Sequence, residues 1–331
     1  MRRRIPAGRN SAGGASRRTT GRGSAQSGPA GTGATAPATG KGSHGCHAGP
    51  SQTRGIWAVT GFQINGHVGV VTGGCSGIGR AIAETLIGEG AQVVVFDLSP
   101  DDAPTGTALA LNVDVSDEQA VARAFATIED RFGDLDFAVN NAGIDIETEP
   151  SEEWLAGPLD RTIDVDLKGV YHCMRHAIAL MRPRKSGAIV NIGSVAALVG
   201  TATRPVYAAS KHAVTGLTRT AAIQFGEDNI RTNIVCPGGT RTDLLEKVMT
   251  DNPVLRDHIV ASCPMRRLAE PSEIADAVLW LVSPRSSFVN GAVISVDGGI
   301  RQADRPAVRH LSATPLRAAG SSKWHQCSRP S

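Results

Sequence analysis

Short apolar runs that alternate with amphipathic runs predict an α/β fold, a doubly wound parallel sheet of about seven strands with helices on both faces. The 331 residues and the 41% hydrophobic content suffice for one large domain with a substantial core. A glycine-rich turn separates the first apolar run, 68–71, from the first helical run, 81–87. Strand, glycine turn and helix in this order begin a Rossmann-type sheet.

The expected elements follow one another along a single dinucleotide-binding domain that spans residues 63–301. Strands are expected at 68–71, 92–97, 108–113, 135–140, 188–192, 230–235 and 292–296, because each run is short and apolar. Helices are expected from 81 and over 117–132, 159–181, 207–225 and 272–281, where apolar residues recur at helical spacing. The run 243–265 is long for a crossover, so we expect it to form a lid over a site.

Two tails flank the domain, a basic extension rich in Gly, Ser and Arg at 1–62 and a second tail at 302–331. Both are predicted to be disordered, because their composition cannot bury enough apolar surface to offset ordering entropy. The extension is open to three interpretations: an organelle transit peptide, a nucleic-acid-binding arm, or a dispensable extension, which we favour. His44, Cys46 and His47 lie in it without a fourth ligand, so no metal site is expected.

Composition excludes several classes of protein. The net charge of +3 gives no electrostatic case for nucleic acid. The six cysteines form no C-x-x-C pair, which fits a reducing compartment and a cytoplasmic protein. No apolar run approaches the length of about 18 residues that a membrane helix needs.

The glycine-rich turn predicts a phosphate cradle, formed by Gly73, Cys75, Ser76, Gly77, Ile78 and Gly79. Glycines let the backbone approach a pyrophosphate, and the helix N-terminus attracts its charge. The alternative is a plain turn between buried elements. Asp97 ends the second strand about 20 residues later, where a carboxylate binds ribose hydroxyls and repels a 2′-phosphate. No basic residue stands at Cys75 or Ser76 or just after Asp97, so the sequence predicts NAD rather than NADP, with Leu98 beside the acid.

Further cofactor contacts are expected where other strands end, because open α/β sheets bind ligands at the carboxyl ends of their strands. Candidates after the third strand are Asp114 and Val115, which border the expected adenine position. Candidates after the fourth strand are Asn140, Ala142 and Gly143.

Three polar residues predict the chemistry. Tyr207 and Lys211 are four residues apart near the start of a helix, so their side chains share a face. A free phenol, with a pKa of about 10, is a poor base at neutral pH, but an adjacent ammonium favours its phenolate. Such a phenol can exchange a proton with an alcohol while a hydride moves. Ser194, thirteen residues before Tyr207, can orient the same oxygen.

Together these motifs resemble the short-chain dehydrogenase/reductase family, from about residue 66 to 299. The likeness is carried by TGGCSGIG at 72–79, NNAG at 140–143, Ser194 with Tyr207 and Lys211, PGGTRT at 237–242, and the closing segment 290–299. The resemblance implies that Lys211 and Tyr207 also hold the nicotinamide ribose. It implies nicotinamide contacts from the turn residues Pro237, Gly238, Gly239, Thr240 and Thr242. It further implies a homotetramer or homodimer built on the long helices and the last strand.

One position departs from the family pattern. Asp166 stands where the family commonly has an asparagine that positions a water in the proton relay. A carboxylate accepts hydrogen bonds but cannot donate as an amide does, and its charge raises the pKa of a neighbouring lysine. We therefore expect Asp166 to act in catalysis with altered relay chemistry. Gly193 replaces a common second serine, which we expect to be harmless.

The leading hypothesis is an NAD-dependent dehydrogenase that converts a cyclic or lipophilic secondary alcohol reversibly into its ketone. The substrate class rests on apolar residues that either line the site or belong to the core: Leu244, Leu245, Val248, Met249 and Leu255 in the lid, and Val195, Leu198 and Val199 after the serine. One alternative is an NADPH-dependent 3-oxoacyl-carrier ketoreductase, against which Asp97 argues. Another is a non-catalytic dinucleotide-binding regulator, and a nucleic-acid binder acting through the basic extension is a fourth hypothesis.

Overall fold

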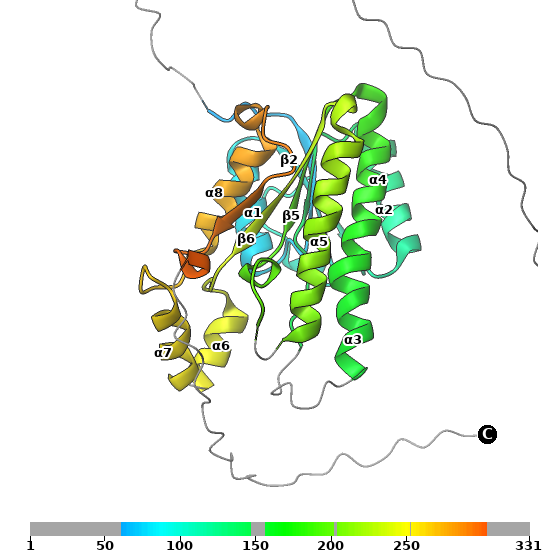
Figure 1. The fold of residues 1–331 in the computed structure, drawn as a ribbon. Helices are drawn as coiled ribbons and strands as arrows, with labels where there is room; N and C mark the ends of the chain where they lie inside the picture. Colours follow the sequence, from blue (N-terminus) through cyan, green and yellow to red (C-terminus); the bar gives the residue numbers. More distant parts are fainter. Residues whose placement is uncertain (1–60, 147–155, 202–203, 252, 303–331) are drawn as a thin grey trace, which may run out of the picture. The chain divides into compact units, whose positions relative to one another are not determined.

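The computed structural model describes residues 61–146, 156–201, 204–251 and 253–302. Seven parallel strands form one sheet in the order β3-β2-β1-β4-β5-β6-β7, which confirms the predicted doubly wound fold (Figure 1). The order reverses between β1 and β4, and sheets of this kind bind ligands outside the strand ends at such a switch point. The strands are β1 (Val68–Thr72), β2 (Gln92–Asp97), β3 (Leu109–Asn112), β4 (Phe137–Asn140), β5 (Gly187–Ile192), β6 (Ile230–Pro237) and β7 (Val293–Val296).

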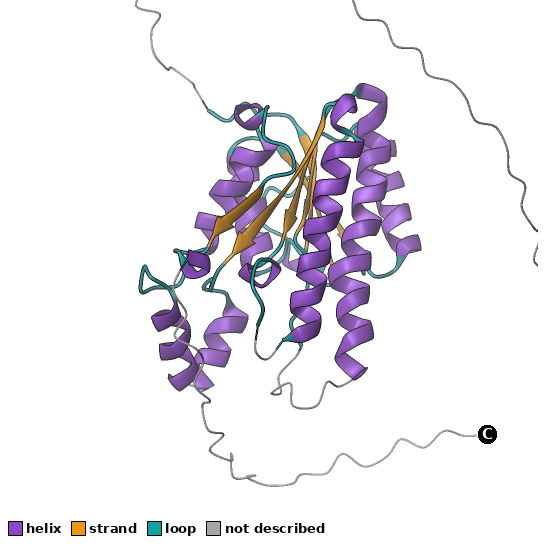
Figure 2. Cartoon of the chain, viewed as in Figure 1, coloured by secondary structure: helices purple, strands orange, loops and turns teal. Residues whose placement is uncertain are grey.

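Helices cover both faces of the sheet (Figures 1 and 2). One face carries α1 (Gly77–Gly88) and α8 (Pro271–Val282), and the other carries α2 (Glu118–Phe132), α4 (Val170–Met181) and α5 (Pro205–Gln224). Successive strand residues point to opposite faces. In β2, therefore, Val93 and Val95 join the core under α1 and α8, while Val94 and Phe96 join the core under the other helices. Both faces are buried, which explains the continuous apolar strands.

The helix predicted over 159–181 begins earlier and changes its hydrogen-bond pattern midway. It runs as α3 (Ala156–Ile163), a π-helical segment η2 (Asp164–Gly169) and then α4. π-Helical turns are rare and occur frequently at functional sites. Here the segment carries Asp166, which is fully buried and accepts a hydrogen bond from the Ile144 N–H at 2.7 Å. Apolar periodicity alone could not reveal this change.

The segment 243–265, expected as a lid, forms two helices, α6 (Asp243–Asp251) and α7 (Pro253–Ser262). They lie toward the end of the sheet to which the strand arrows point (Figure 1). Met249 is buried and Leu245 is half-buried. The side chains of Leu244, Val248 and Leu255 lie outside the described residues, and closure of this segment over a site stays a prediction.

The domain is slightly longer than predicted at its amino end. Phe62, assigned from sequence to the disordered extension, is half-buried and packs against the α1–α8 core, with the Arg285 guanidinium 5.0 Å from its ring centroid. Gln302, assigned to the other tail, belongs to the 3₁₀ turn η7 (Ile300–Gln302). Residues 1–60 and 303–331 lie outside the described residues. Other 3₁₀ turns are η1 (Pro100–Asp102), η3 (Arg182–Arg184), η4 (Val195–Ala197), η5 (Gly226–Asp228) and η6 (Pro284–Ser286).

Candidate active site

The glycine-rich loop joins the carboxyl end of β1 to the N-terminus of α1. Gly73 and Gly77 have φ angles of 64° and 52°, in the left-handed region that favours glycine. A Cβ on Gly79 would stand 1.9 Å from the Gly73 carbonyl oxygen, so the loop packs on the helix only without one. Ser76, the N-cap, makes no side-chain cap hydrogen bond, and Ile78 is half-buried against the core. The first N–H groups of α1, without a side-chain cap, therefore suit an anion.

Asp97, at the end of β2, lies directly beside this loop. Its Oδ2 accepts from the Cys75 N–H at 3.0 Å, and its Oδ1 accepts from the Ser99 N–H at 3.1 Å. Each oxygen retains a further lone pair for a ribose hydroxyl. Burial, and then the charge of Asp97, raise the pKa of the Cys75 thiol to about 11, so this thiol keeps its proton. The Leu98 side chain is exposed.

A basic side chain that sequence reasoning did not consider also reaches the loop. The Arg80 guanidinium donates to the Asp102 carbonyl at 3.1 Å and to the Cys75 carbonyl at 3.5 Å. Its Nε forms an ion pair with Glu84 at 2.8 Å. Arg80 therefore brings positive charge near Asp97, but that charge is shared with an acid. No local pattern of residues signals this contact, because the direction of the side chain depends on how the loop folds.

Polar side chains join β1, β4 and β5 at the same edge of the sheet. Asn140 Nδ2 donates to Asn191 Oδ1 at 2.7 Å, and both residues are buried. Thr72 Oγ1 accepts from the N–H groups of Asn141 and Ala142, each at 3.0 Å. The segment after β4 is thereby held against the glycine loop, as expected for residues that border a shared ligand.

Asp114 and Val115 follow β3 and lie farther from this cluster. Burial of Asp114 opposes the shift, but hydrogen bonds from Ser116 and the charge of Arg161 hold its pKa below the ordinary value. The Ser116 N–H and hydroxyl donate to Asp114 Oδ1 at 2.9 and 2.6 Å. Val115 is buried, and its carbonyl lies 3.2 Å from His172 Nδ1. The Asp114 carboxylate is therefore already well coordinated by the chain itself.

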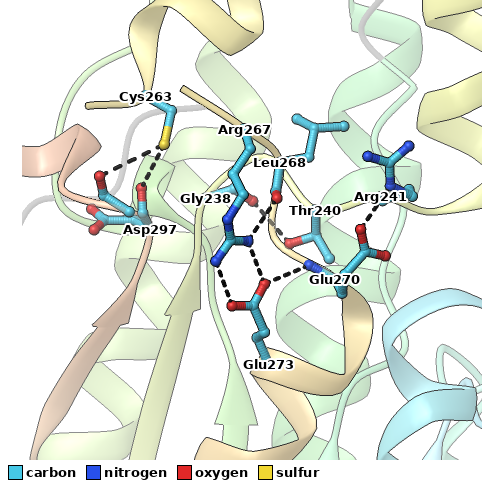
Figure 3. A network of polar contacts seen from close by, with 10 residues as sticks. Gly238, Thr240, Arg241, Cys263, Arg267, Leu268, Glu270, Glu273 and Asp297 are labelled. Carbon is cyan, nitrogen blue, oxygen red and sulfur yellow. Dashed lines mark hydrogen bonds and ion pairs between the residues drawn. The ribbon is translucent and has the colours of Figure 1, made fainter. Parts of the chain in front are cut away.

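The turn after β6 is held by a polar network at the start of α8 (Figure 3). Arg267 forms a two-pronged ion pair with Glu273 at 2.6 and 2.8 Å, and the Glu270 N–H donates to the same carboxylate at 2.8 Å. These bonds lower the pKa of Glu273 to about 2. Arg241, inside the turn, pairs with Glu270 at 2.9 Å.

The predicted residues of this turn are closely packed. Pro237 is the last residue of β6, and the glycine turn follows it directly. A Cβ on Gly238 would stand 2.9 Å from the Asp297 Cα, so glycine is needed for contact with the end of β7. The Leu268 side chain lies against Gly239, and Thr240 is buried, its Oγ1 donating to the Gly238 carbonyl at 3.2 Å. Thr242 approaches the glycine loop, since a Cβ on Gly77 would lie 3.2 Å from its Cγ2.

A buried ion pair lies at the centre of the candidate site. Lys211 Nζ stands 3.2 Å from Asp166 Oδ2, and the two side chains are 4% and 0% exposed. Burial would lower the pKa of Lys211, but the charges of Asp166 and Tyr207, together with the hydrogen bond to Asp166, hold that pKa above the ordinary value. Burial raises the pKa of Asp166, and Lys211 opposes this only in part. A Cβ on Gly143 would stand 3.0 Å from Lys211 Nζ, so glycine leaves room for the ammonium.

Tyr207 lies beside this pair, and Ser194 lies on a turn that packs against the helix of Tyr207. Lys211 Nζ is 5.4 Å from the centroid of the Tyr207 ring. Ser194 is the N-cap of η4, which packs against α5, the helix that carries Tyr207. Ser194 Oγ accepts from the Ala196 N–H at 3.1 Å, which leaves its O–H free to donate to another oxygen.

Two charged residues here were not identified from sequence. Arg204, the residue before α5, places its guanidinium carbon 5.8 Å from the Tyr207 ring centroid and forms an ion pair with Asp145. The two residues are separated by 59 positions, so only the tertiary structure brings them together.

These arrangements fit a dinucleotide. The glycine cradle admits no Cβ at Gly79, the helix N-terminus is open to an anion, and the Asp97 carboxylate keeps acceptor capacity for a ribose. The part of the chain that the structure describes holds no group of three or more His, Cys, Asp or Glu suited to a metal ion. The tract with His44, Cys46 and His47 lies outside it. No helix of the described residues is long and apolar enough to span a membrane.

Known proteins are similar in sequence to this chain over most of the domain. The sequence profile of a family described as Enoyl-(Acyl carrier protein) reductase matches residues 73–301. A 2,5-dichloro-2,5-cyclohexadiene-1,4-diol dehydrogenase from Sphingobium indicum is 37% identical over 244 residues, which cover 72% of this chain and 98% of that protein. A cis-4-hydroxycyclohexanecarboxylate dehydrogenase from Sinomonas cyclohexanicum is 40% identical over 240 residues, covering 70% of this chain and 95% of that protein.

Solved structures share the fold. The crystal structure of levodione reductase matches with a TM-score of 0.69 and 35% identity, over 73% of this chain and 100% of that chain. A structure described as ElxO with NADP bound matches with a TM-score of 0.68 and 30% identity, over 72% of this chain and 100% of that chain. Sequence, fold and site agree, and the chain belongs to the short-chain dehydrogenase/reductase family of oxidoreductases.

Proposed function

We propose that this protein is an NAD-dependent dehydrogenase that interconverts a secondary alcohol and its ketone, with a ring-shaped, largely apolar substrate. The observation that carries the proposal is the buried pair of Lys211 and Asp166 placed next to the ring of Tyr207. A buried ammonium held beside a phenol is the arrangement that acid–base chemistry at an alcohol oxygen needs.

In this mechanism Tyr207 exchanges the proton with the substrate oxygen. Lys211 stabilises the phenolate with its charge, which Asp166 helps to hold in the protonated form. Ser194 donates its free O–H to the same oxygen and orients it. When bound, the nicotinamide ring supplies the acceptor or the source of the hydride. Asp166 acts on the chemistry through Lys211.

The choice of NAD rests on Asp97. Its carboxylate borders the glycine loop with spare acceptor capacity, and its charge opposes a 2′-phosphate. Replacing it with serine should lower kcat/KM with NAD about tenfold or more, because a hydrogen bond to a charged group is lost. The same Asp97→Ser change should raise kcat/KM with NADP. If the preference between the cofactors did not change, Asp97 would not be the determinant.

The substrate class is supported by the relatives and by the residues after Ser194. Val195, Leu198 and Val199 are half-buried apolar side chains beside the candidate site. The relatives are named as dehydrogenases and a reductase, and two of the names specify substituted cyclohexane or cyclohexadiene compounds. We therefore place cyclic secondary alcohols first in a substrate panel.

The deciding experiment is turnover of such a panel by purified protein, followed as NADH formation at neutral to alkaline pH. Tyr207→Phe should reduce kcat by about 100-fold or more, since the proton-transferring group is removed. The variant should still bind the cofactor. Turnover that survives this change would refute the mechanism. Cofactor binding with no turnover of any alcohol or ketone would instead favour a non-catalytic dinucleotide-binding regulator.

A second candidate is an NADPH-dependent ketoreductase of the 3-oxoacyl-carrier type. Two observations favour it. The Arg80 guanidinium reaches the Cys75 carbonyl beside Asp97, and one of the solved structures with this fold has NADP bound. Activity with NADPH and a 3-oxoacyl thioester, without NAD-dependent alcohol oxidation, would select it.

We also propose that the protein forms a homotetramer or homodimer. Tyr171 on α4 and Ile223 on α5 are large exposed side chains on the two long helices, and β7 is a half-buried edge strand. Light scattering of the purified protein tests this, and a monomer would contradict it.

A further inference from the structure

Two cations lie close to the ring of Tyr207. Lys211 Nζ lies 5.4 Å from the ring centroid and Arg204 Cζ lies 5.8 Å from it. Each cation is paired with its own carboxylate, Lys211 with Asp166 and Arg204 with Asp145. The phenol ring therefore lies near two ion pairs, of which the mechanism above uses only one.

The second pair is anchored to the first. Asp145 follows Ile144, whose N–H donates to Asp166 Oδ1 at 2.7 Å. The Arg204 carbonyl accepts from the Thr201 hydroxyl at 3.0 Å, immediately before α5 begins. The Arg204–Asp145 contact thus connects the segment after β4 to the N-terminus of the helix that carries Tyr207.

We propose that Arg204 is a positioning residue for the acid–base chemistry of Tyr207, and that Asp145 limits its effect. The guanidinium adds positive charge at the ring, and positive charge favours the phenolate. Asp145 holds the guanidinium in place and offsets part of its charge. The inference rests on the proposed function of Tyr207 as the proton-transferring group.

The other charged groups on the elements around the Tyr207 ring do not take the role of the Arg204–Asp145 pair. On η2, Lys168 pairs with Asp164 at 2.7 Å on the surface. On α3, Arg161 interacts with Asp114 at 3.5 Å, and Asp160 also carries a charge. Burial raises the pKa of the Cys236 thiol on β6 to about 11, so it is neutral at physiological pH.

The chain contains a matched control pair at the opposite end of α5. Arg182 pairs with Asp228 at 2.9 Å, and its guanidinium carbon lies 5.7 Å from the centroid of the Phe225 ring. The contact has the same three components, an arginine, an aspartate and an aromatic ring. It lies where α4 and α5 end, whereas Arg204 lies where α5 begins.

The chain has only two tyrosines, Tyr171 and Tyr207, which allows a direct optical test. In a Tyr171→Phe background one phenol remains, and its ionisation can be followed by tyrosinate absorbance with no need for turnover. Charges about 6 Å apart in water shift a titration midpoint by about half a pH unit. Arg204→Gln should therefore raise the midpoint by about half to one unit, and Asp145→Asn should lower it.

Further variants separate charge from structure. Arg204→Lys keeps the positive charge, so its titration midpoint should return most of the way to that of the Tyr171→Phe background. The double variant Arg204→Gln with Asp145→Asn loses both charges, so its midpoint should lie close to that background. Arg182→Gln should leave the midpoint unchanged. Circular dichroism recorded at each pH confirms that the titrated protein is folded.

With an alcohol that the protein oxidises, the midpoint of the kcat/KM profile should move in the same directions. An optical midpoint that Arg204→Gln leaves in place would overturn the proposal, as would equal shifts from Arg204→Gln and Arg182→Gln. A rise in KM confined to acidic substrates, with an unchanged midpoint, would also overturn it and make Arg204 a substrate-binding residue. Failure of the whole alcohol panel would refute the proposed function while leaving the optical test intact.

Discussion

Replacing Asp166 with asparagine removes the negative charge next to Lys211 and leaves the shape of the side chain almost unchanged. The amide oxygen can still accept the hydrogen bond from the Ile144 N–H, which is 2.7 Å long in the present structure. What disappears is a negative charge 3.2 Å from Lys211 Nζ. Removing a negative charge makes every neighbouring proton easier to lose, so we expect the midpoint of the pH–rate profile to move to lower pH.

The magnitude follows from the distances. The carboxylate lies at most about 9 Å from the centroid of the Tyr207 ring, because Lys211 Nζ is 3.2 Å from Asp166 Oδ2 and 5.4 Å from that centroid. At effective dielectric constants of about 20 to 80, unit charges at that separation interact by about 0.5 to 2 kcal/mol. The expected shift is therefore about half to one and a half pH units.

The unfolding free energy should respond differently to replacing Asp166 and to replacing Lys211. Asp166→Asn removes the desolvation penalty of the carboxylate along with its attraction to the ammonium, so it should change the unfolding free energy by less than about 2 kcal/mol. Lys211→Met leaves a buried carboxylate without its partner and should cost about 3 to 5 kcal/mol. Adding Asp166→Asn to Lys211→Met should recover part of that loss.

The loss caused by Lys211→Met should also depend on pH in a defined direction. Burial raises the pKa of Asp166, so its ionised form is destabilising and that destabilisation develops as pH rises above the ordinary carboxyl range. Lowering the pH should therefore reduce the difference between the variant and the wild type. Urea unfolding from pH 5 to 9 and the pH dependence of kcat/KM measure these effects. A profile of Asp166→Asn that overlays the wild type, with equal stability losses for both single variants, would refute the reasoning.

Three glycine substitutions give further tests. Gly143→Ala would place a methyl group 3.0 Å from Lys211 Nζ, so we expect kcat/KM to fall about tenfold or more. Gly216→Ala, an exposed helical glycine whose added methyl would meet nothing within 4 Å, should leave activity unchanged and stabilise the protein by about 0.5 to 1 kcal/mol in thermal unfolding. Gly193→Ser should destabilise the protein by about 1 to 3 kcal/mol, because a Cβ there would stand 2.9 Å from Ile234 Cδ1. Adding Ile234→Val should reduce that loss, and its failure to do so would show that the overlap is relieved elsewhere.

The last substitution also qualifies the expectation that glycine at 193 is harmless. The residue is tolerated because Ile234 and Cys236 fill the space that a serine side chain would occupy. The two neighbours belong to β6, about 40 positions later in the chain. Comparing the residue type at position 193 with the family pattern could not show this compensation, because the compensation depends on which strand pairs with β5.

Local patterns in the sequence determined the fold class, the order of the elements and the edge of the sheet where the candidate site lies. Apolar runs, glycine turns and helical spacing act over a few residues, so they can be read without tertiary contacts. Tertiary packing alone decided which side chains meet: Asp166 with Lys211, Arg204 with Asp145, and Arg80 with the carbonyl of Cys75. Each of the first two contacts joins residues on separate elements, and the third depends on the fold of a loop. Their distances and burial are set by how the helices and the sheet pack together, which no local pattern encodes.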